Sequence, residues 1–399
     1  MATLYFNGAV DNNWATLGNW WTSGDFTTQA SALPTSSDSV VLSATCDANS
    51  GSAPTVVNLT CNGVAGFLYL EIAITVSGSA TFNGSFYSNG GVNGNVTFND
   101  NAGHNGGTNT GNATFNDSAY NYGFIDGNAT FNGSSYNDLG GTINGHATFN
   151  HSSFNNDGNF YGDATFNDSA YNFGFAGGNA TFNDSSNNDT GTVSGDATFN
   201  DSSINGGTVT GNATFNDSSV NNDIVSGDAT FNGISYNYNT VEGNATFNDS
   251  SVNNDTVSGD ATFNDNSSND GGAITGNATF NDSSINGGAI TGDATFNDSS
   301  INGGTVSGNA TFNDSSINGG TVSGNATFNG SSYNGGSVDD DATFNGSSYN
   351  GGSVDDDATF RDSSYNDSTG VVNGVELYED RTPFPIPRGI NGSSILGVI

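Results

Sequence analysis

A phenylalanine recurs every 16 to 18 residues over most of this 399-residue chain. It marks eighteen near-copies of the stretch Ala310–Ala326, which reads ATFNDSSINGGTVSGNA. A period this short and regular is typical of a solenoid, in which each repeat forms one coil that buries its apolar side chains only by stacking on its neighbours. The marker residues are Phe82, Phe98, Phe115, Phe131, Phe149, Phe166, Phe182, Phe199, Phe215, Phe231, Phe247, Phe263, Phe280, Phe296, Phe312, Phe328, Phe344 and Phe360.

The residue types of the repeat favour strands and turns over helix. Gly, Asn, Ser and Thr dominate it, and the period is too short for a pair of helices. The repeats contain no proline, as backbone ladders require. We predict an all-β fold, a parallel β-solenoid (β-helix) of about eighteen coils of 16–18 residues. Residues 1–80 should form an N-terminal cap and the first coils, residues 81–374 the solenoid, and residues 375–399 a Pro-rich segment and a terminal strand.

Four columns of apolar side chains are expected to fill the core. Two consist of the marker Phe and of the Ala two residues before it. A third column is mixed and contains Ile285, Ile301, Ile317, Val252, Tyr333 and Tyr349. A fourth column holds Val or Ile, as at Val306, Val322 and Ile290. Two Asn columns, one after the Phe and one after the mixed position, are predicted to form hydrogen-bonded ladders along the stack.

Charge excludes several classes of partner. The formal net charge is −37, with only three basic residues. Nucleic-acid binding needs a cationic surface, and so does attachment to an anionic membrane. No apolar stretch reaches the 18 residues of a membrane-spanning helix, so we expect no membrane insertion. Met1–Gly8 contains neither a basic n-region nor an apolar run, and an extracellular role would therefore require an export route other than an ordinary signal peptide.

Aspartates form two columns of the repeat. One follows the Phe-Asn pair and is interrupted by glycine, while the other precedes the Ala and alternates with asparagine. Unit charges ~4.8 Å apart repel by roughly 1 kcal/mol even in water, so both patterns would relieve repulsion. The alternation would also follow if the ancestral duplication unit were two repeats. The alternating column reads Asp163, Asn179, Asp196, Asn212, Asp228, Asn244, Asp260, Asn277, Asp293 and Asn309.

Acidic residues accumulate where this alternation ends. Carboxylates are the ligands that calcium prefers, and we predict a calcium site there, set against a merely solvated acidic face. No other cofactor is expected. The predicted ligands are Asp339, Asp340, Asp341, Asp355, Asp356 and Asp357.

The two cysteines, Cys46 and Cys61, lie about one coil apart in the sequence. Neighbouring coils would allow a disulfide in an oxidising environment, and two small buried residues are the equal alternative. At the other end of the chain, Pro383, Pro385 and Pro387 predict an extended segment before an apolar final strand. We expect Arg361 and this tail to protect the open end of the stack, or the tail to pair with another subunit.

The N-terminal segment resembles the opening of autotransporter-like and related bacterial or viral β-helix proteins. The residues that carry the resemblance are Phe6-Asn7-Gly8, Trp14, Asn19-Trp20-Trp21, Pro34 and Asp38-Ser39-Val40-Val41-Leu42, about a tenth of the chain. In those proteins a W-x4-N-W segment, a Pro-containing loop and a D-x-V strand begin the first coils. The resemblance implies a surface-exposed fibre or adhesin, and it carries over no catalytic residue.

The function expected from these features is structural. Parallel β-helices include polysaccharide-cleaving enzymes, but nearly every acid here belongs to a repeating column, and no coil stands out as an active site; we predict no enzymatic activity. We expect a fibre, spike or filament subunit, extracellular on a virion or cell surface, that self-associates through its ends. The alternatives are a secreted adhesin or matrix protein that binds cell-surface glycans and, on the regular Thr column, an ice-binding protein.

Overall fold

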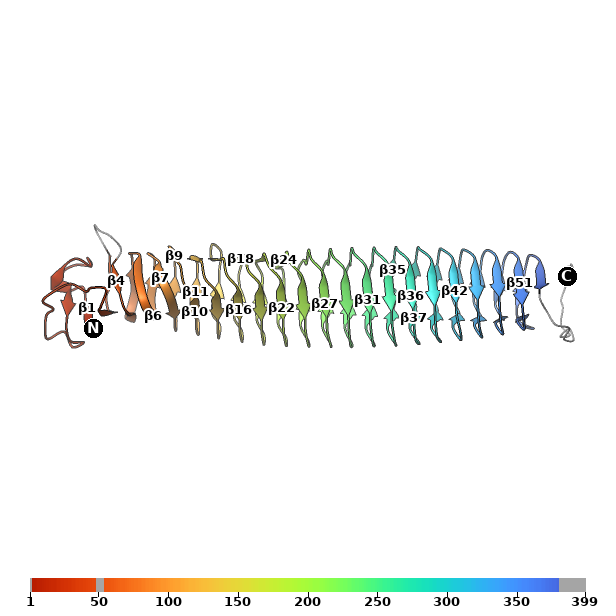
Figure 1. Ribbon diagram of the computed structural model, residues 1–399, viewed down its shortest axis with the longest axis horizontal. Helices are drawn as coiled ribbons and strands as arrows, with labels where there is room; N and C mark the ends of the chain where they lie inside the picture. Colours follow the sequence, from red (N-terminus) through yellow and green to blue (C-terminus); the bar gives the residue numbers. More distant parts are fainter. Residues whose placement is uncertain (1, 48–53, 380–399) are drawn as a thin grey trace. The chain divides into compact units, whose positions relative to one another are not determined.

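The computed structural model describes residues 2–47 and 54–379. The chain divides into two compact units, residues 1–197 with 202–210 and residues 198–201 with 211–399. In each unit the backbone winds into coils of parallel β-structure, so the predicted β-solenoid is confirmed (Figure 1). The Pro-rich segment and the terminal strand expected after residue 380 lie outside the described residues.

The first unit begins with strands that differ from the repeats. These are β1 (Thr3–Phe6), β2 (Trp20–Trp21), β3 (Ser39–Leu42), β4 (Thr55–Val56), β5 (Leu59–Leu70) and β6 (Ile74–Ser88), with a 3-10 helix, η1 (Leu17–Asn19), before β2. Strand β1 pairs in parallel with β3 and antiparallel with β2. Trp20 is fully buried against Phe6 and Trp14, and its Nε1 donates a hydrogen bond to the Trp14 carbonyl at 2.8 Å.

Each coil of the repeats carries up to three short strands. The first ends at the marker Phe, except that β51 runs one residue further: β7 (Val92–Phe98), β10 (Ala113–Phe115), β13 (Ala129–Phe131), β16 (Ala147–Phe149), β19 (Ala164–Phe166), β22 (Ala180–Phe182), β25 (Ala197–Phe199), β27 (Ala213–Phe215), β29 (Ala229–Phe231), β31 (Ala245–Phe247), β33 (Ala261–Phe263), β36 (Ala278–Phe280), β39 (Ala294–Phe296), β42 (Ala310–Phe312), β45 (Ala326–Phe328), β48 (Ala342–Phe344) and β51 (Ala358–Arg361).

The second strand of each coil usually ends at an Asn: β8 (Gly103–His104), β11 (Tyr120–Asn121), β14 (Tyr136–Asn137), β17 (Phe154–Asn155), β20 (Tyr171–Asn172), β23 (Asn187–Asn188), β26 (Ile204–Asn205), β28 (Val220–Asn221), β30 (Tyr236–Asn237), β32 (Val252–Asn253), β34 (Ser268–Asn269), β37 (Ile285–Asn286), β40 (Ile301–Asn302), β43 (Ile317–Asn318), β46 (Tyr333–Asn334), β49 (Tyr349–Asn350) and β52 (Tyr365–Asn366).

The third strand forms a sheet of its own in each unit. In the first unit this sheet contains β9 (Thr108–Asn109), β12 (Phe124–Ile125), β15 (Thr142–Ile143), β18 (Asn159–Phe160), β21 (Phe175–Ala176) and β24 (Thr192–Val193). In the second unit it contains β35 (Ala273–Ile274), β38 (Ala289–Ile290), β41 (Thr305–Val306), β44 (Thr321–Val322), β47 (Ser337–Val338), β50 (Ser353–Val354) and β53 (Val371–Val372). The last described strand, β54 (Glu376–Glu379), pairs with β51.

Coils stack in register, so like residues lie above like residues. In the second unit Ala294, Thr295 and Phe296 pair with the Ala, Thr and Phe of β42. The marker Phe rings are fully buried in both units, and within each unit consecutive rings stack with their centroids 4.6–4.9 Å apart. The Phe, Ala and Val or Ile columns of the predicted core are therefore confirmed.

The predicted mixed column was wrong, because its side chains face outward. Ile285 is 44% exposed, and Ile301, Ile317, Val252, Tyr333 and Tyr349 are partly exposed. A corner residue with a left-handed backbone precedes this strand, as Asp314 does with φ of 60°, and it changes which positions face inward. Ser and Asn take the inward places instead: Ser316 and Asn318 are fully buried on either side of Ile317.

Most polar side chains of the interior form hydrogen bonds between coils, although, among the residues that the structure describes, Ser203, Ser219, Ser235 and Ser316 are buried without a partner for the hydroxyl. The buried Asn column forms a ladder in each unit, for example Asn302 Nδ2 to Asn318 Oδ1 at 2.8 Å. The Ser column reaches the backbone, as Ser332 Oγ does by donating to the Phe312 carbonyl at 3.3 Å. A second Asn ladder, half-buried, runs beside the Phe column, with Asn329 Nδ2 donating to Asn313 Oδ1 at 2.9 Å. Both predicted Asn ladders are thus present.

Two further predictions concern single residues. Arg361, which replaces Asn in the outer ladder, pairs through Nε with Glu379 Oε2 of β54 at 3.0 Å. Cys46 and Cys61 are buried and their thiols are free. Cys61 lies in register with Leu42 and Phe82, whereas the backbone of Cys46 forms an isolated parallel β-bridge with Leu70. Burial raises the pKa of both thiols. The structure therefore fits the alternative prediction, in which the two cysteines are small buried residues without a disulfide.

Candidate functional site

The aspartates that follow the Phe-Asn pair all share one backbone conformation. They lie at a corner of the coil with φ near +60°, as Asp117, Asp217 and Asp314 do, or with a smaller positive φ, 49° at Asp282 and 44° at Asp298. Glycines that interrupt the column have the same conformation, with φ of 72° at Gly133 and 72° at Gly233. Asp and Gly are among the residues that tolerate this region, so the column is selected by backbone geometry first. In several coils the carboxylate accepts a hydrogen bond from the corner N–H of the preceding coil, as Asp249 Oδ2 does from the N–H of Gly233 at 3.1 Å.

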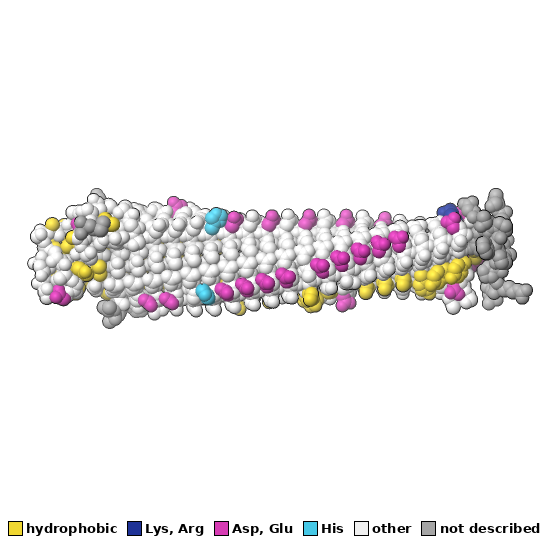
Figure 2. All heavy atoms as spheres, turned by 60° about the horizontal axis from the view of Figure 1, so that its bottom comes forward, with side chains coloured by type: hydrophobic (Ala, Val, Ile, Leu, Met, Phe, Trp, Pro, Cys, Tyr) yellow, Lys and Arg dark blue, Asp and Glu magenta, His cyan; other side chains and the backbone are white. Residues whose placement is uncertain are grey.

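The alternating column has a structural role of its own. Each side chain accepts, through Oδ1, the backbone N–H of the corresponding residue in the next coil. In the second unit, Asn244 N–H donates to Asp228 at 2.8 Å and Asp260 N–H donates to Asn244 at 2.9 Å. Asp and Asn offer the same acceptor, so alternation keeps every bond while it halves the density of negative charge. Figure 2 shows exposed acidic side chains spaced regularly along the repeats.

Alternation fails at Asp341 and Asp357, which follow each other in this column. Carboxylate oxygens of Asp340, Asp341 and Asp356 lie within 4.8 Å of one another, and all three residues are exposed. The charge of Asp341 is the main cause that raises the pKa of Asp356. Of the six predicted calcium ligands, the structure brings these three together and leaves Asp339, Asp355 and Asp357 outside the group. Three exposed carboxylates supply donors of the kind that calcium prefers, but fewer than the six to eight oxygens it takes, so water would complete the shell.

Asp341→Asn is expected to raise the melting temperature at low salt. The substitution keeps the Oδ1 acceptor for Asp357 N–H, places a neutral amide next to Asp357 in the column and removes the charge that disfavours ionised Asp356. The gain should disappear near 1 M NaCl, where the Debye length is about 3 Å. Asp293→Asn is the matched control, because Asp293 already lies between Asn277 and Asn309. If the gain reverses when calcium is added, the cluster binds calcium; equal gains for both variants would contradict the repulsion argument.

Outward-facing apolar residues form a row along the second strand of the coils. In the second unit the row passes from Ile285 through tyrosines, with ring centroids 4.6 Å apart for Tyr333 and Tyr349 and 5.3 Å apart for Tyr349 and Tyr365. Hydrophobic side chains gather in such a row in Figure 2. Because the rings stack along the coils, their faces cover one another and their edges point to solvent.

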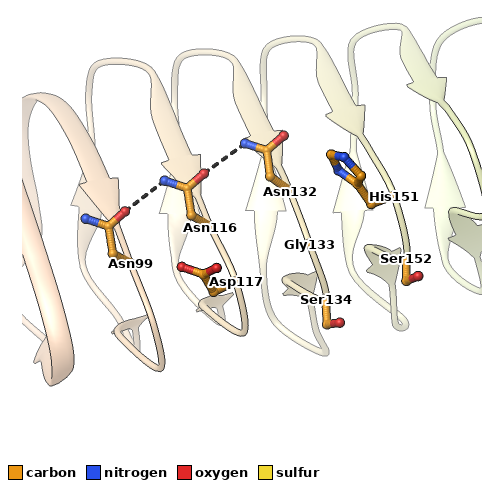
Figure 3. A pocket seen from close by; sticks show the side chains of 8 residues that line it. All are labelled: Asn99, Asn116, Asp117, Asn132, Gly133, Ser134, His151 and Ser152. Carbon is orange, nitrogen blue, oxygen red and sulfur yellow. Dashed lines mark hydrogen bonds between the residues drawn. The ribbon is translucent and has the colours of Figure 1, made fainter.

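A shallow hollow of about 600 Å³, widely open to solvent, lies at the corner of the coils in the first unit. Gly133 is one of its lining residues, and its missing side chain interrupts the row between Asp117 and His151 (Figure 3). The amides of Asn99, Asn116 and Asn132 form one side and are linked by hydrogen bonds of 2.8 and 2.9 Å. Ser134 and Ser152 lie at the opposite edge. Sequence reasoning missed this site, although two adjacent departures from the repeat, Gly133 and His151, were the signal for it.

No protein-family model matches this chain, and no curated protein or solved structure shows significant similarity to it. Among the described residues, no helix is long and apolar enough to cross a lipid bilayer. The class of protein that can be stated is the one that the fold itself defines, a parallel β-solenoid built from tandem repeats.

Proposed function

We propose that this chain is a non-enzymatic structural protein, a fibre, spike or filament subunit on a virion or cell surface. The observation that carries the proposal is the uninterrupted Phe column, buried in every coil of each unit. Each coil hydrogen-bonds to the next through its backbone and through two Asn ladders. A repeat stack of this kind gains stability from each added interface between neighbouring coils, which suits a protein whose role is mechanical.

The surface and the N-terminal residues support an exposed location. A net charge of −37 opposes side-by-side aggregation through electrostatic repulsion. Self-association is therefore proposed to use the ends of the stack, where backbone groups are available for pairing. The resemblance of residues 6–42 to the opening of autotransporter-like and viral β-helix proteins favours the same role, since such proteins act as fibres or adhesins.

Negative-stain electron microscopy of the full chain tests this proposal. We expect elongated particles, and their length should depend on the number of coils. A variant that lacks residues 279–342, four coils of 16 residues, should be shorter by about 19 Å, because paired strands are ~4.8 Å apart. Compact particles, or a length that does not change with the deletion, would refute the structural role.

A further inference from the structure

Two adjacent coils of the first unit depart from the repeat at the same corner. Between Asp117 and Asp168, the left-handed position is occupied by Gly133 and then by His151, with φ of 72° and 60°. Asp or Gly adopts this backbone conformation as readily as histidine, so the conformation does not explain why histidine occupies the position. The two departures together create the hollow over Gly133.

The departures also change the hydrogen bonding of the corner. Elsewhere in this unit the N–H of the corner residue donates to the carboxylate of the next coil, from Gly84 to Asp100 at 3.0 Å and from His151 to Asp168 at 3.0 Å. Gly133 has no side chain, and His151 has no carboxylate. The corner N–H groups of Asp117 and Gly133 therefore lack this acceptor, and both residues line the hollow.

The remaining lining defines what fits there. Asp117 and the Asn side chains supply oxygen acceptors, while the amide nitrogens and the two backbone N–H groups supply donors. A hydroxyl group can satisfy both kinds of partner at once. An anion is disfavoured by the Asp117 carboxylate and by the net charge of −37. The Asn amides are uncharged, and Asp117 is the only carboxylate in the lining, fewer acidic ligands than a bound metal cation usually has.

We propose that the hollow over Gly133 binds one neutral sugar unit of a glycan. Sugar hydroxyls accept from the N–H groups of Asp117 and Gly133 and donate to the Asp117 carboxylate and to the Asn amide oxygens. His151 closes the far side with its imidazole (Figure 3). This binding site is independent of the structural role proposed above, since a chain with or without it can serve as a fibre.

The second unit contains a matched control. Gly233 has the same backbone conformation, with φ of 72°, but it lies between two aspartates, Asp217 and Asp249. Its N–H already donates to Asp249 Oδ2 at 3.1 Å. Gly133→Asp fills the hollow with the side chain that the corner carries in most coils, and Gly233→Asp makes the same change where no sugar site is expected.

Saturation-transfer NMR and calorimetry on the full chain provide the test, with glucose, galactose, mannose and N-acetylglucosamine as neutral probes and glucuronic acid as the acidic one. We expect at least one neutral sugar to bind the wild-type chain and Gly233→Asp with equal affinity. Gly133→Asp should abolish this binding, and Asp117→Asn should weaken it about tenfold, the effect of losing one charge-assisted hydrogen bond. Circular dichroism verifies that each variant is folded, and Asp117→Asn keeps the test valid if Gly133→Asp is not.

Three results would overturn the proposal. The first is that none of the neutral sugars binds the wild-type chain. The second is that Gly133→Asp and Asp117→Asn bind as well as the wild type, which would place the sugar elsewhere. The third is that glucuronic acid alone binds, which would assign the hollow to anions.

Discussion

Asn302→Leu should lower the free energy of unfolding by about 2 to 5 kcal/mol, because it leaves two buried amide groups without partners. Asn302 is fully buried in the ladder of the second unit. It accepts from Asn286 Nδ2 at 2.8 Å and donates to Asn318 Oδ1 at 2.8 Å. Leucine has nearly the same volume, so the loss would come from the hydrogen bonds and not from a cavity. Chemical denaturation, with hydrogen exchange to locate the affected coils, measures it.

Two further variants separate this explanation from a general intolerance to change. Asn302→Asp can accept from Asn286 but, when ionised, cannot donate to Asn318, and it buries a charge. Its destabilisation should therefore be larger at pH 7 than at pH 4, where a protonated carboxyl can donate. Asn313→Leu, in the half-buried outer ladder, should cost less, since water can replace the lost partner. Equal losses for Asn302→Leu and Asn313→Leu would show that burial of the ladder does not matter.

Acid should destabilise the first unit through the protonation of His104. His104 is fully buried in the Asn column, where it pairs with Ser88 on one side and Asn121 on the other. Burial lowers its pKa to about 4, and the nearby backbone of Phe124 and Ser88 offsets only part of this effect. Within the described residues, neither ring nitrogen has a hydrogen-bond partner of good geometry. The native chain therefore holds this imidazole in its neutral form.

The sign of the pH dependence follows from the two states. An unfolded histidine has a pKa of about 6.5, so between pH 6.5 and pH 4 the unfolded chain binds a proton that the folded chain does not. The contribution of neutral His104 to the free energy of unfolding is fully present above pH 6.5. It falls by about 3 kcal/mol in all as the pH drops toward 4. Hydrogen exchange of β8 and β11 at pH 7, 6 and 5 should show this loss locally.

His104→Asn restores the residue that this column has in the following coils, and it should remove the acid dependence between pH 7 and pH 5. Gly123 supports the comparison: a Cβ atom there would overlap the His104 ring, so the histidine fits only beside glycine. His151→Asn, at an exposed corner, is the control and should leave the profile unchanged. An unchanged profile in His104→Asn would assign the acid sensitivity to other groups.

The regularity of the sequence made most of the fold predictable. The Phe register fixed the coil length, and the Asn columns indicated ladders that the structure contains. The direction of the second strand could not be derived from hydrophobicity. By residue type Ile317 belongs to the core, yet the left-handed corner at Asp314 turns it outward and turns Ser316 and Asn318 inward. The inward and outward alternation of side chains along a strand, with its period of two, does not predict such a change at a turn.

By itself the sequence determined that like residues stack on like, because a repeated 16- to 18-residue unit buries its apolar side chains only against its own copies. Only the tertiary structure decided which groups meet at a corner. The hollow over Gly133 lies between side chains 34 residues apart, Asp117 and His151, and their proximity depends on coil stacking and on the backbone angles of three corner residues. Contacts between coils follow from backbone geometry that side-chain type alone does not specify.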